Sequence, residues 1–92
     1  MEFECRKTEN CFSDSQTWEY RLQETAEDFE KRLEGWKVEE NRRFRRPMMT
    51  AERGEVKLKG ILASGVIRVS FPDAAWQKEK AAFEEWLGEE RA

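Results

Sequence analysis

The sequence predicts an α+β domain, in which an antiparallel sheet of about four to five strands carries two helices on one face and leaves the other face basic. Several segments alternate apolar and charged residues with the period of two that is typical of half-buried strands. Two other segments carry apolar residues at helical spacing and begin with residues that cap helices. The 92 residues are expected to form a single domain, residues 1–92, because a second core would need a longer chain.

The first part of the chain contains two predicted strands. Residues 2–7 alternate between charged and apolar side chains, and Thr17–Leu22 alternates in the same way. Between them, residues 8–15 are rich in Ser, Thr, Asn and Asp, which favour turns and loops. A single helix from about residue 13 to Leu33 is the alternative interpretation, so residues 13–24 could be strand or helix.

A first helix is predicted from about Thr25 to Glu34. Thr25 is a good N-cap, and the acidic residues that follow it suit the positive end of the helix dipole. Apolar residues recur at helical spacing from Ala26 to Leu33, and Gly35 is a suitable residue to follow the helix end.

Three strands and two connections are predicted between residues 36 and 71. The period of two returns at Trp36, with Phe44 on the side that faces the core, and Pro47 ends this first strand. Gly65 can take the positive φ of a short hairpin loop. In chain order we expect a strand at 36–46, a connection at 48–54, a strand at 55–62, a loop at 63–65 and a strand at 66–71.

A final helix is predicted from about Ala74 to Leu87. Pro72 and Asp73 close the preceding strand and cap the helix, and Gly88 ends it. Its expected apolar stripe consists of Ala75, Trp76, Ala82, Phe83, Trp86 and Leu87.

Basic residues are concentrated in the middle of the chain. Residues 36–71 carry nine Lys or Arg and four Asp or Glu, whereas residues 1–35 carry five and ten. If the helices cover one side of the sheet, alternation places basic side chains on the other side, offset there by Glu39 and Glu55. The candidate binding residues are Lys37, Arg42, Arg43, Arg45, Arg46, Lys57, Lys59 and Arg68.

This distribution, together with the lack of any catalytic constellation in the sequence, predicts a non-enzymatic binding protein. Lys and Arg that neutralise phosphates release condensed counterions, and a guanidinium can hold a phosphate or carboxylate with two hydrogen bonds. The overall charge of −3 disfavours bulk nucleic acid, so we expect a protein or ribonucleoprotein partner. A small nucleic-acid-binding or transcription-regulating module is the alternative, and a merely solvated charged face is the competing structural interpretation.

Other kinds of chemistry find little support in the sequence. The chain has no His, so Cys5 and Cys11 could form a four-ligand zinc site only with carboxylates or a second chain, and we expect neither metal nor cofactor. The two cysteines are expected to be reduced structural thiols; an enzyme or redox protein that uses them would lack a base to activate them. The absence of a long apolar run or a signal-peptide pattern predicts a cytoplasmic protein without a membrane partner, and we expect no small-molecule substrate.

The single small domain, its segregated charge and the segment Arg42-Arg43-Phe44-Arg45-Arg46 on a mixed helix and sheet scaffold resemble the phage-encoded anti-CRISPR proteins. The resemblance is to inhibitors of type I, in particular type I-F, surveillance complexes. It implies an inhibitor that binds Cas subunits and guide RNA in the host bacterial cytoplasm and prevents target DNA from binding or pairing. These proteins share no signature motif, so the resemblance assigns no role to individual residues.

Overall fold

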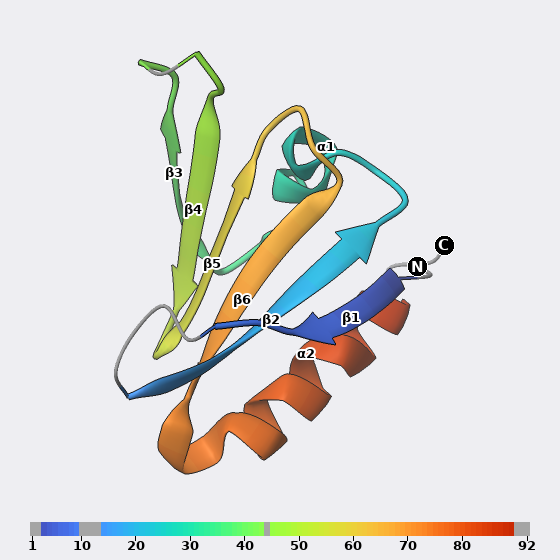
Figure 1. The fold of residues 1–92 in the computed structure, drawn as a ribbon, viewed down its shortest axis with the longest axis vertical. Helices are drawn as coiled ribbons and strands as arrows, with labels where there is room; N and C mark the ends of the chain where they lie inside the picture. Colours follow the sequence, from blue (N-terminus) through green and yellow to red (C-terminus); the bar gives the residue numbers. More distant parts are fainter. Residues whose placement is uncertain (1–2, 10–13, 44, 90–92) are drawn as a thin grey trace.

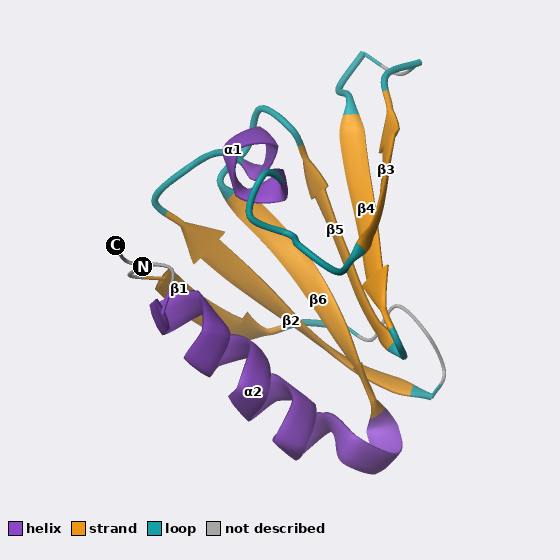
Figure 2. Ribbon diagram, turned by 180° about the vertical axis from the view of Figure 1, so that it is seen from behind, coloured by secondary structure: helices purple, strands orange, loops and turns teal. Residues whose placement is uncertain are grey.

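The computed structural model describes residues 3–9, 14–43 and 45–89. It confirms the α+β class: the described strands form one open antiparallel sheet, and both helices pack on the same face of it (Figures 1 and 2). The elements in chain order are β1 (Phe3–Lys7), β2 (Ser15–Leu22), α1 (Ala26–Glu30), β3 (Lys37–Asn41), β4 (Met48–Arg53), β5 (Val56–Ile61), β6 (Val66–Pro72), a 3-10 turn η1 (Asp73–Ala75) and α2 (Trp76–Glu89).

The sheet has six strands in the order β1-β2-β6-β5-β4-β3, one strand more than the upper end of our expectation. β2 occupies residues for which a helix was the alternative interpretation. It pairs with β1 on one side and with β6 on the other, so its backbone groups are satisfied on both edges. Alternation along β2 turns Trp18, Tyr20 and Leu22 toward the helices.

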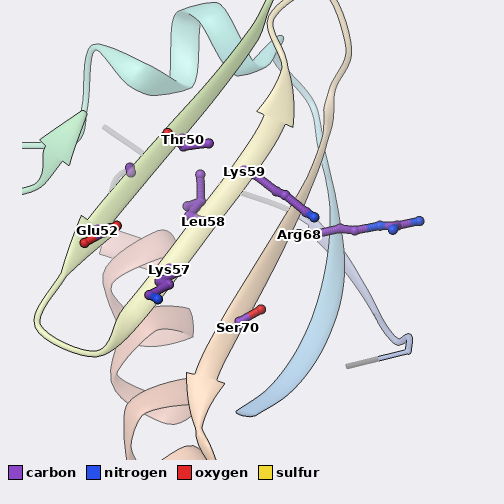
Figure 3. Close-up of a pocket in the computed structure, with 8 residues that line it drawn as sticks. Thr50, Glu52, Lys57, Leu58, Lys59, Arg68 and Ser70 are labelled. Carbon is purple, nitrogen blue, oxygen red and sulfur yellow. The ribbon is translucent and has the colours of Figure 1, made fainter. Parts of the chain in front are cut away.

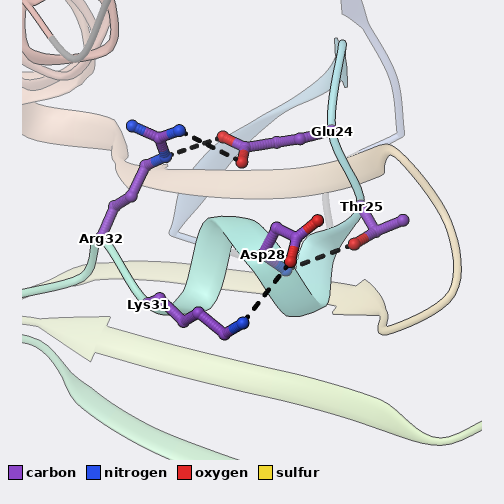
Figure 4. A network of polar contacts seen from close by, with 5 residues as sticks. All are labelled: Glu24, Thr25, Asp28, Lys31 and Arg32. Carbon is purple, nitrogen blue, oxygen red and sulfur yellow. Dashed lines mark hydrogen bonds and ion pairs between the residues drawn. The ribbon is translucent and has the colours of Figure 1, made fainter. Parts of the chain in front are cut away.

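α1 begins where Thr25 predicts but ends earlier than expected. The Thr25 hydroxyl accepts a hydrogen bond from the Asp28 N–H at 3.3 Å, as an N-cap does (Figure 4). The helix ends at Glu30 rather than Glu34, and the next residues continue in tighter turns with bonds to the third preceding carbonyl. Gly35 then takes a φ of 81° and leads the chain into β3.

An ion pair fastens the segments on either side of α1 to each other. Arg32 follows the helix and Glu24 precedes it, and Arg32 Nε lies 2.9 Å from Glu24 Oε1 (Figure 4). The two side chains meet beside the short helix and help to stabilise it. A helix of only five residues would be unstable alone.

The prediction for residues 36–54 was wrong in two places. β3 ends at Asn41, whose side-chain oxygen accepts the Arg43 N–H at 3.0 Å and turns the chain out of the strand. The arginines of residues 42–46 therefore belong to the β3–β4 connection and not to a strand. The expected connection at residues 48–54 instead contains β4, in which Met49 and Ala51 face the core.

Two glycines act differently from the prediction. Gly65 is not among the described residues with positive φ. Its lack of a side chain instead lets the backbone of residue 65 lie close to that of Leu22, because an added Cβ would be 3.1 Å from the Leu22 carbonyl oxygen. Gly88 lies within α2 and does not end it. Gly54, with a φ of 62°, forms the tight turn between β4 and β5.

The core lies between the helices and the covered face of the sheet, and Phe83 of α2 is at its centre. The Phe83 ring lies 5.2 Å from that of Tyr20 and 5.9 Å from that of Phe71, between ring centroids. Of the predicted stripe, Phe83 and Leu87 are buried, whereas Ala82 is exposed and was assigned wrongly. Burial of these aromatic rings is the main attraction between helix and sheet.

Two expectations concern residues outside the described part of the chain, namely the core position of Phe44 and the redox state of Cys11. Neither helix in the described ranges combines the length and the apolar run needed to cross a membrane.

Candidate anion-binding face of the sheet

The sheet face opposite the helices, called the open face below, carries alternate residues of all six strands. The strand register sets these residues in rows that run across the sheet. One row contains Lys37, Glu52, Lys57, Ser70 and Thr17. The next row contains Glu39, Thr50, Lys59, Arg68, Glu19 and Arg6.

A shallow hollow lies where the basic residues of β5 and β6 meet. Its volume is about 290 Å³, and the polar residues that line it alternate along three neighbouring strands (Figure 3). Three of the predicted binding residues therefore come together in one place, although β5 and β6 place them up to eleven positions apart in the chain. The lining consists of Thr50, Ala51, Glu52, Lys57, Leu58, Lys59, Arg68 and Ser70.

Lys59 and Arg68 form a like-charge pair in this hollow. They are direct cross-strand partners, and their side chains project to the same side of the sheet (Figure 3). Lys59 is half-buried and has no hydrogen bond or ion pair to any other residue that the structure describes. Like charges in directly opposed positions destabilise a sheet, so this pair favours an anion beside it.

Glu19 offsets part of this positive charge. Its carboxylate lies 2.8 Å from an Arg6 nitrogen and 3.7 Å from Arg68 Nε, so two arginines share one acidic partner. The expectation that Glu39 and Glu55 are the acidic residues of this face needs correction. Glu19 and Glu52 also lie there, whereas Glu55 is in the β4–β5 turn, so the open face is more balanced than predicted.

The predicted arginine cluster lies at the end of the β3–β4 hairpin, which extends past the neighbouring strands (Figure 1). Arg42 Nε lies 3.0 Å from Glu40 Oε1, and this hydrogen bond raises the pKa of Arg42. Arg42 is therefore already engaged within the protein. Arg43, Arg45 and Arg46 are exposed and make no ion pair within the described ranges, so their side chains are accessible to a ligand.

Thr50 connects the hairpin end to the hollow between β5 and β6. A second hollow, of about 430 Å³, lies at the base of the arginine segment, and Thr50 lines both hollows. The two basic regions thus border one continuous surface. The second hollow is lined by Glu39, Glu40, Asn41, Arg42, Arg43, Met48 and Thr50.

A pair of carboxyl groups lies on the covered side of this hairpin. Burial, and then the neighbouring carboxylate of Glu40, raise the pKa of Glu30 to about 7. Hydrogen bonds from Glu30 and Arg42 hold the pKa of Glu40 below its usual value. Glu30 therefore holds a proton at pH values at which Glu40 is ionised, and the two side chains join α1 to β3.

The exposed thiol of Cys5 lies on the helix side of β1, next to a polar cluster. The Tyr20 hydroxyl donates a hydrogen bond to Glu84 at 2.9 Å, and Lys80 forms an ion pair with the same carboxylate. Partial desolvation against the neighbouring residues raises the pKa of the Cys5 thiol and outweighs the opposite effects of Tyr20 and Lys80, which leaves a weak nucleophile. Among the described residues no group of three His, Cys, Asp or Glu could hold a metal ion.

Sequence reasoning found the basic residues of the hollow but missed its neutral ones. Ser70 follows Arg68 by two positions, and Thr50 lies in a segment that was expected to be a connection. Alternation from Arg68 would have placed Ser70 on the open face. Thr50 could be found only after β4 was recognised, because Ala and Met are weak indicators of a strand.

The comparisons with known proteins leave the family open. No protein-family model matches the chain, and neither the curated proteins nor the solved structures contain a match.

Proposed function

We propose that the protein is a non-enzymatic binding module that holds the RNA backbone of a ribonucleoprotein on its open face and its arginine hairpin. The observation that carries this proposal is the cross-strand pair of Lys59 and Arg68. Two cations in directly opposed positions repel each other. A phosphate bound between them offsets this repulsion, because each cation then forms an ion pair with it. Lys57 and the hydroxyl group of Thr50 supply further donors around the same hollow, whereas the buried Ser70 hydroxyl is bonded to that of Thr17.

The distribution of the remaining charge supports a ribonucleoprotein over naked nucleic acid. The chain has a net charge of −3, and exposed acidic residues lie on both helices, including Glu27 and Asp28 on α1 and Glu85 on α2. A free polyanion meets repulsion everywhere except at the open face and the hairpin. A complex with RNA at its surface and basic protein beside the RNA complements both kinds of surface.

The resemblance to anti-CRISPR proteins suggests a CRISPR–Cas surveillance complex as this ribonucleoprotein. Under this proposal the protein acts in the cytoplasm of the host bacterium, contacts Cas subunits and guide RNA, and prevents target DNA from binding or pairing. Its action is stoichiometric and needs no cofactor.

The first experiment measures the affinity for a single-stranded RNA oligonucleotide by fluorescence anisotropy over a range of salt concentrations. A variant with Lys59→Gln and Arg68→Gln is compared with a control in which exposed Lys31 and Lys78 of the helix side are changed to Gln. Both variants lose the same charge. We expect the first to weaken binding and to reduce the salt slope by about 1.4, since each phosphate contact to a single strand contributes about 0.7. Equal loss in both variants contradicts the proposal.

A second experiment separates the surface from the named partner. The same proteins are added to a purified type I surveillance complex, and target DNA binding is followed by gel shift. Inhibition that is lost with Lys59→Gln and Arg68→Gln supports the Cas partner. RNA binding without inhibition leaves the anion-binding face in place and rejects the inhibitor role.

The hairpin end favours one other candidate, a direct nucleic-acid-binding or transcription-regulating module. Arg45 and Arg46 are exposed at the end of a two-stranded ribbon, and such a ribbon fits the major groove of duplex DNA. This candidate predicts that Arg45→Ala with Arg46→Ala abolishes a gel shift of duplex DNA, whereas Lys59→Gln with Arg68→Gln leaves it largely intact. The opposite order of effects favours the open face.

A further inference from the structure

β1 is an edge strand with a row of outward-facing backbone groups. It pairs with β2 only, within the described ranges, and its residues from Glu4 to Lys7 are exposed. The Thr8 N–H donates to the Thr17 carbonyl at 3.2 Å, one step beyond the β1–β2 register. Hydrogen-bonded and non-bonded pairs alternate in an antiparallel ladder, so the N–H and C=O groups of Phe3, Cys5 and Lys7 point away from β2. Such an edge can accept another strand.

We infer that this edge pairs with β1 of a second copy of the chain, in an antiparallel register centred on Cys5. In that register Phe3 lies opposite Lys7 of the second copy and Cys5 lies opposite Cys5, so the three outward-facing residues of each copy all form hydrogen-bonded pairs. The inference is independent of the proposed function.

Charge complementarity favours the same register. It sets Glu4 opposite Arg6 of the second copy at non-hydrogen-bonded positions, where cross-strand side chains come closest. Within one copy Glu4 forms no ion pair with another described residue. Arg6 pairs with Glu19 through one guanidinium nitrogen at 2.8 Å, but its side chain is 76% exposed. Each copy therefore offers one unsatisfied carboxylate and one accessible guanidinium to the other.

The other edge of the sheet is less suited to the same arrangement. A full-overlap antiparallel pairing of β3 with itself is centred on Glu39 and sets this residue against its own copy. Two carboxylates in directly opposed positions repel each other. Self-association is thus expected at β1, where it joins the open faces of two copies into one larger surface.

Disulfide trapping tests the central contact. In a hydrogen-bonded pair the two Cα atoms lie about 5.5 Å apart, which is within the range of about 4.4–6.8 Å found in disulfides. The protein with Cys11→Ser is treated with a mild oxidant at alkaline pH, because the Cys5 thiol must ionise to react. We expect a covalent dimer linked through Cys5. It should form faster than the mixed disulfide between Cys5 and an added small thiol.

A mixing experiment tests the register. Two proteins are prepared without native cysteines (Cys5→Ser, Cys11→Ser), one with Glu4→Cys and the other with Arg6→Cys. These two positions face each other across the dimer, whereas each lies about 8 Å from its own copy, beyond disulfide reach. We expect the mixture to cross-link at least about tenfold faster than either protein alone. Equal rates in all three samples overturn the inference.

Analytical ultracentrifugation of the unchanged chain, with thiols kept reduced, tests the dimer without cross-linking. We expect reversible dimer formation that Cys5→Pro abolishes and Cys5→Ser preserves. The Cys5 N–H points away from β2, so proline removes a donor of the dimer and none of the β1–β2 ladder. A monomer at all concentrations, or a dimer that persists with Cys5→Pro, contradicts the inference; circular dichroism checks that the variants are folded.

Discussion

Lys59 on β5 and Arg68 on β6 are direct cross-strand partners, and both side chains project from the open face. Their repulsion lowers the stability of the folded protein, and a bound anion removes this destabilisation. Lys59→Thr should therefore raise the stability of the free protein at low salt, by an amount of the order of a typical cross-strand pair interaction, about 0.2–1 kcal/mol. Urea unfolding with and without a phosphate-containing polyanion measures both effects.

Lys57→Thr is the matched control for this prediction. Lys57 lies opposite Glu52 on one side and Ser70 on the other, so its removal relieves no repulsion between direct partners. We expect no gain in stability. If Lys59→Thr destabilises the free protein as much as Lys57→Thr does, Lys59 and Arg68 do not repel each other measurably. The pair would then no longer indicate a bound anion.

Phe83 is the centre of the aromatic core, and it contacts rings on β2, β6 and α2 itself. Phe83→Ala should lower the free energy of unfolding by about 3–5 kcal/mol, because it removes buried apolar surface and leaves a cavity. Ala82 is its exposed neighbour, and Ala82→Ser should change stability by no more than about 0.5 kcal/mol. Urea denaturation of both variants compares them; similar losses would show that α2 packs on the sheet through another face.

Stability should depend on pH through Glu30. Burial raises the pKa of Glu30 from 4.5 to about 7, so the folded protein binds this proton more tightly than the unfolded chain does. On account of this group, stability falls as the pH rises from about 4.5 to about 7. The lowered pKa of Glu40 acts in the opposite direction, and its contribution is lost only at pH values below the usual range of a Glu.

Glu30→Gln should therefore raise the melting temperature above pH 7 and leave it nearly unchanged near pH 4, below the unfolded pKa of 4.5. Thermal unfolding monitored by circular dichroism over this pH range measures the effect. Glu27→Gln, at an exposed position of the same helix, is the control and should not flatten the profile. An equal response of the two variants would mean that Glu30 titrates as an ordinary exposed carboxyl.

The N-cap residue of α1, Thr25, should contribute measurably to the unfolding free energy although the helix is short. Thr25→Ala removes the hydroxyl that accepts the Asp28 N–H and should cost about 1 kcal/mol of unfolding free energy. Thr25→Ser keeps the oxygen and should cost much less. The two variants are compared by urea denaturation, and equal losses would assign the effect to the Thr methyl group rather than to the cap.

Much of the fold could be predicted because local signals and tertiary packing agree there. The strands that became β5 and β6 show strict alternation, and Thr25 and Pro72 mark the starts of the helical segments. The segment at residues 36–54 could not be assigned in this way. Its alternation continues through the arginines, and the Asn41 side-chain bond that ends β3 depends on the geometry of the turn.

The α+β class could be predicted without the structure. So could the helical face that buries Phe83 and Leu87, and the position of Lys57, Lys59 and Arg68 on the face away from the helices. These follow from side-chain periodicity, which is a local property. Which charged side chains lie next to each other depends instead on the tertiary structure. Strand order and register set Lys59 against Arg68, brought Glu19 beside Arg68 and placed the arginine segment at a hairpin end, because pairing partners come from distant parts of the chain.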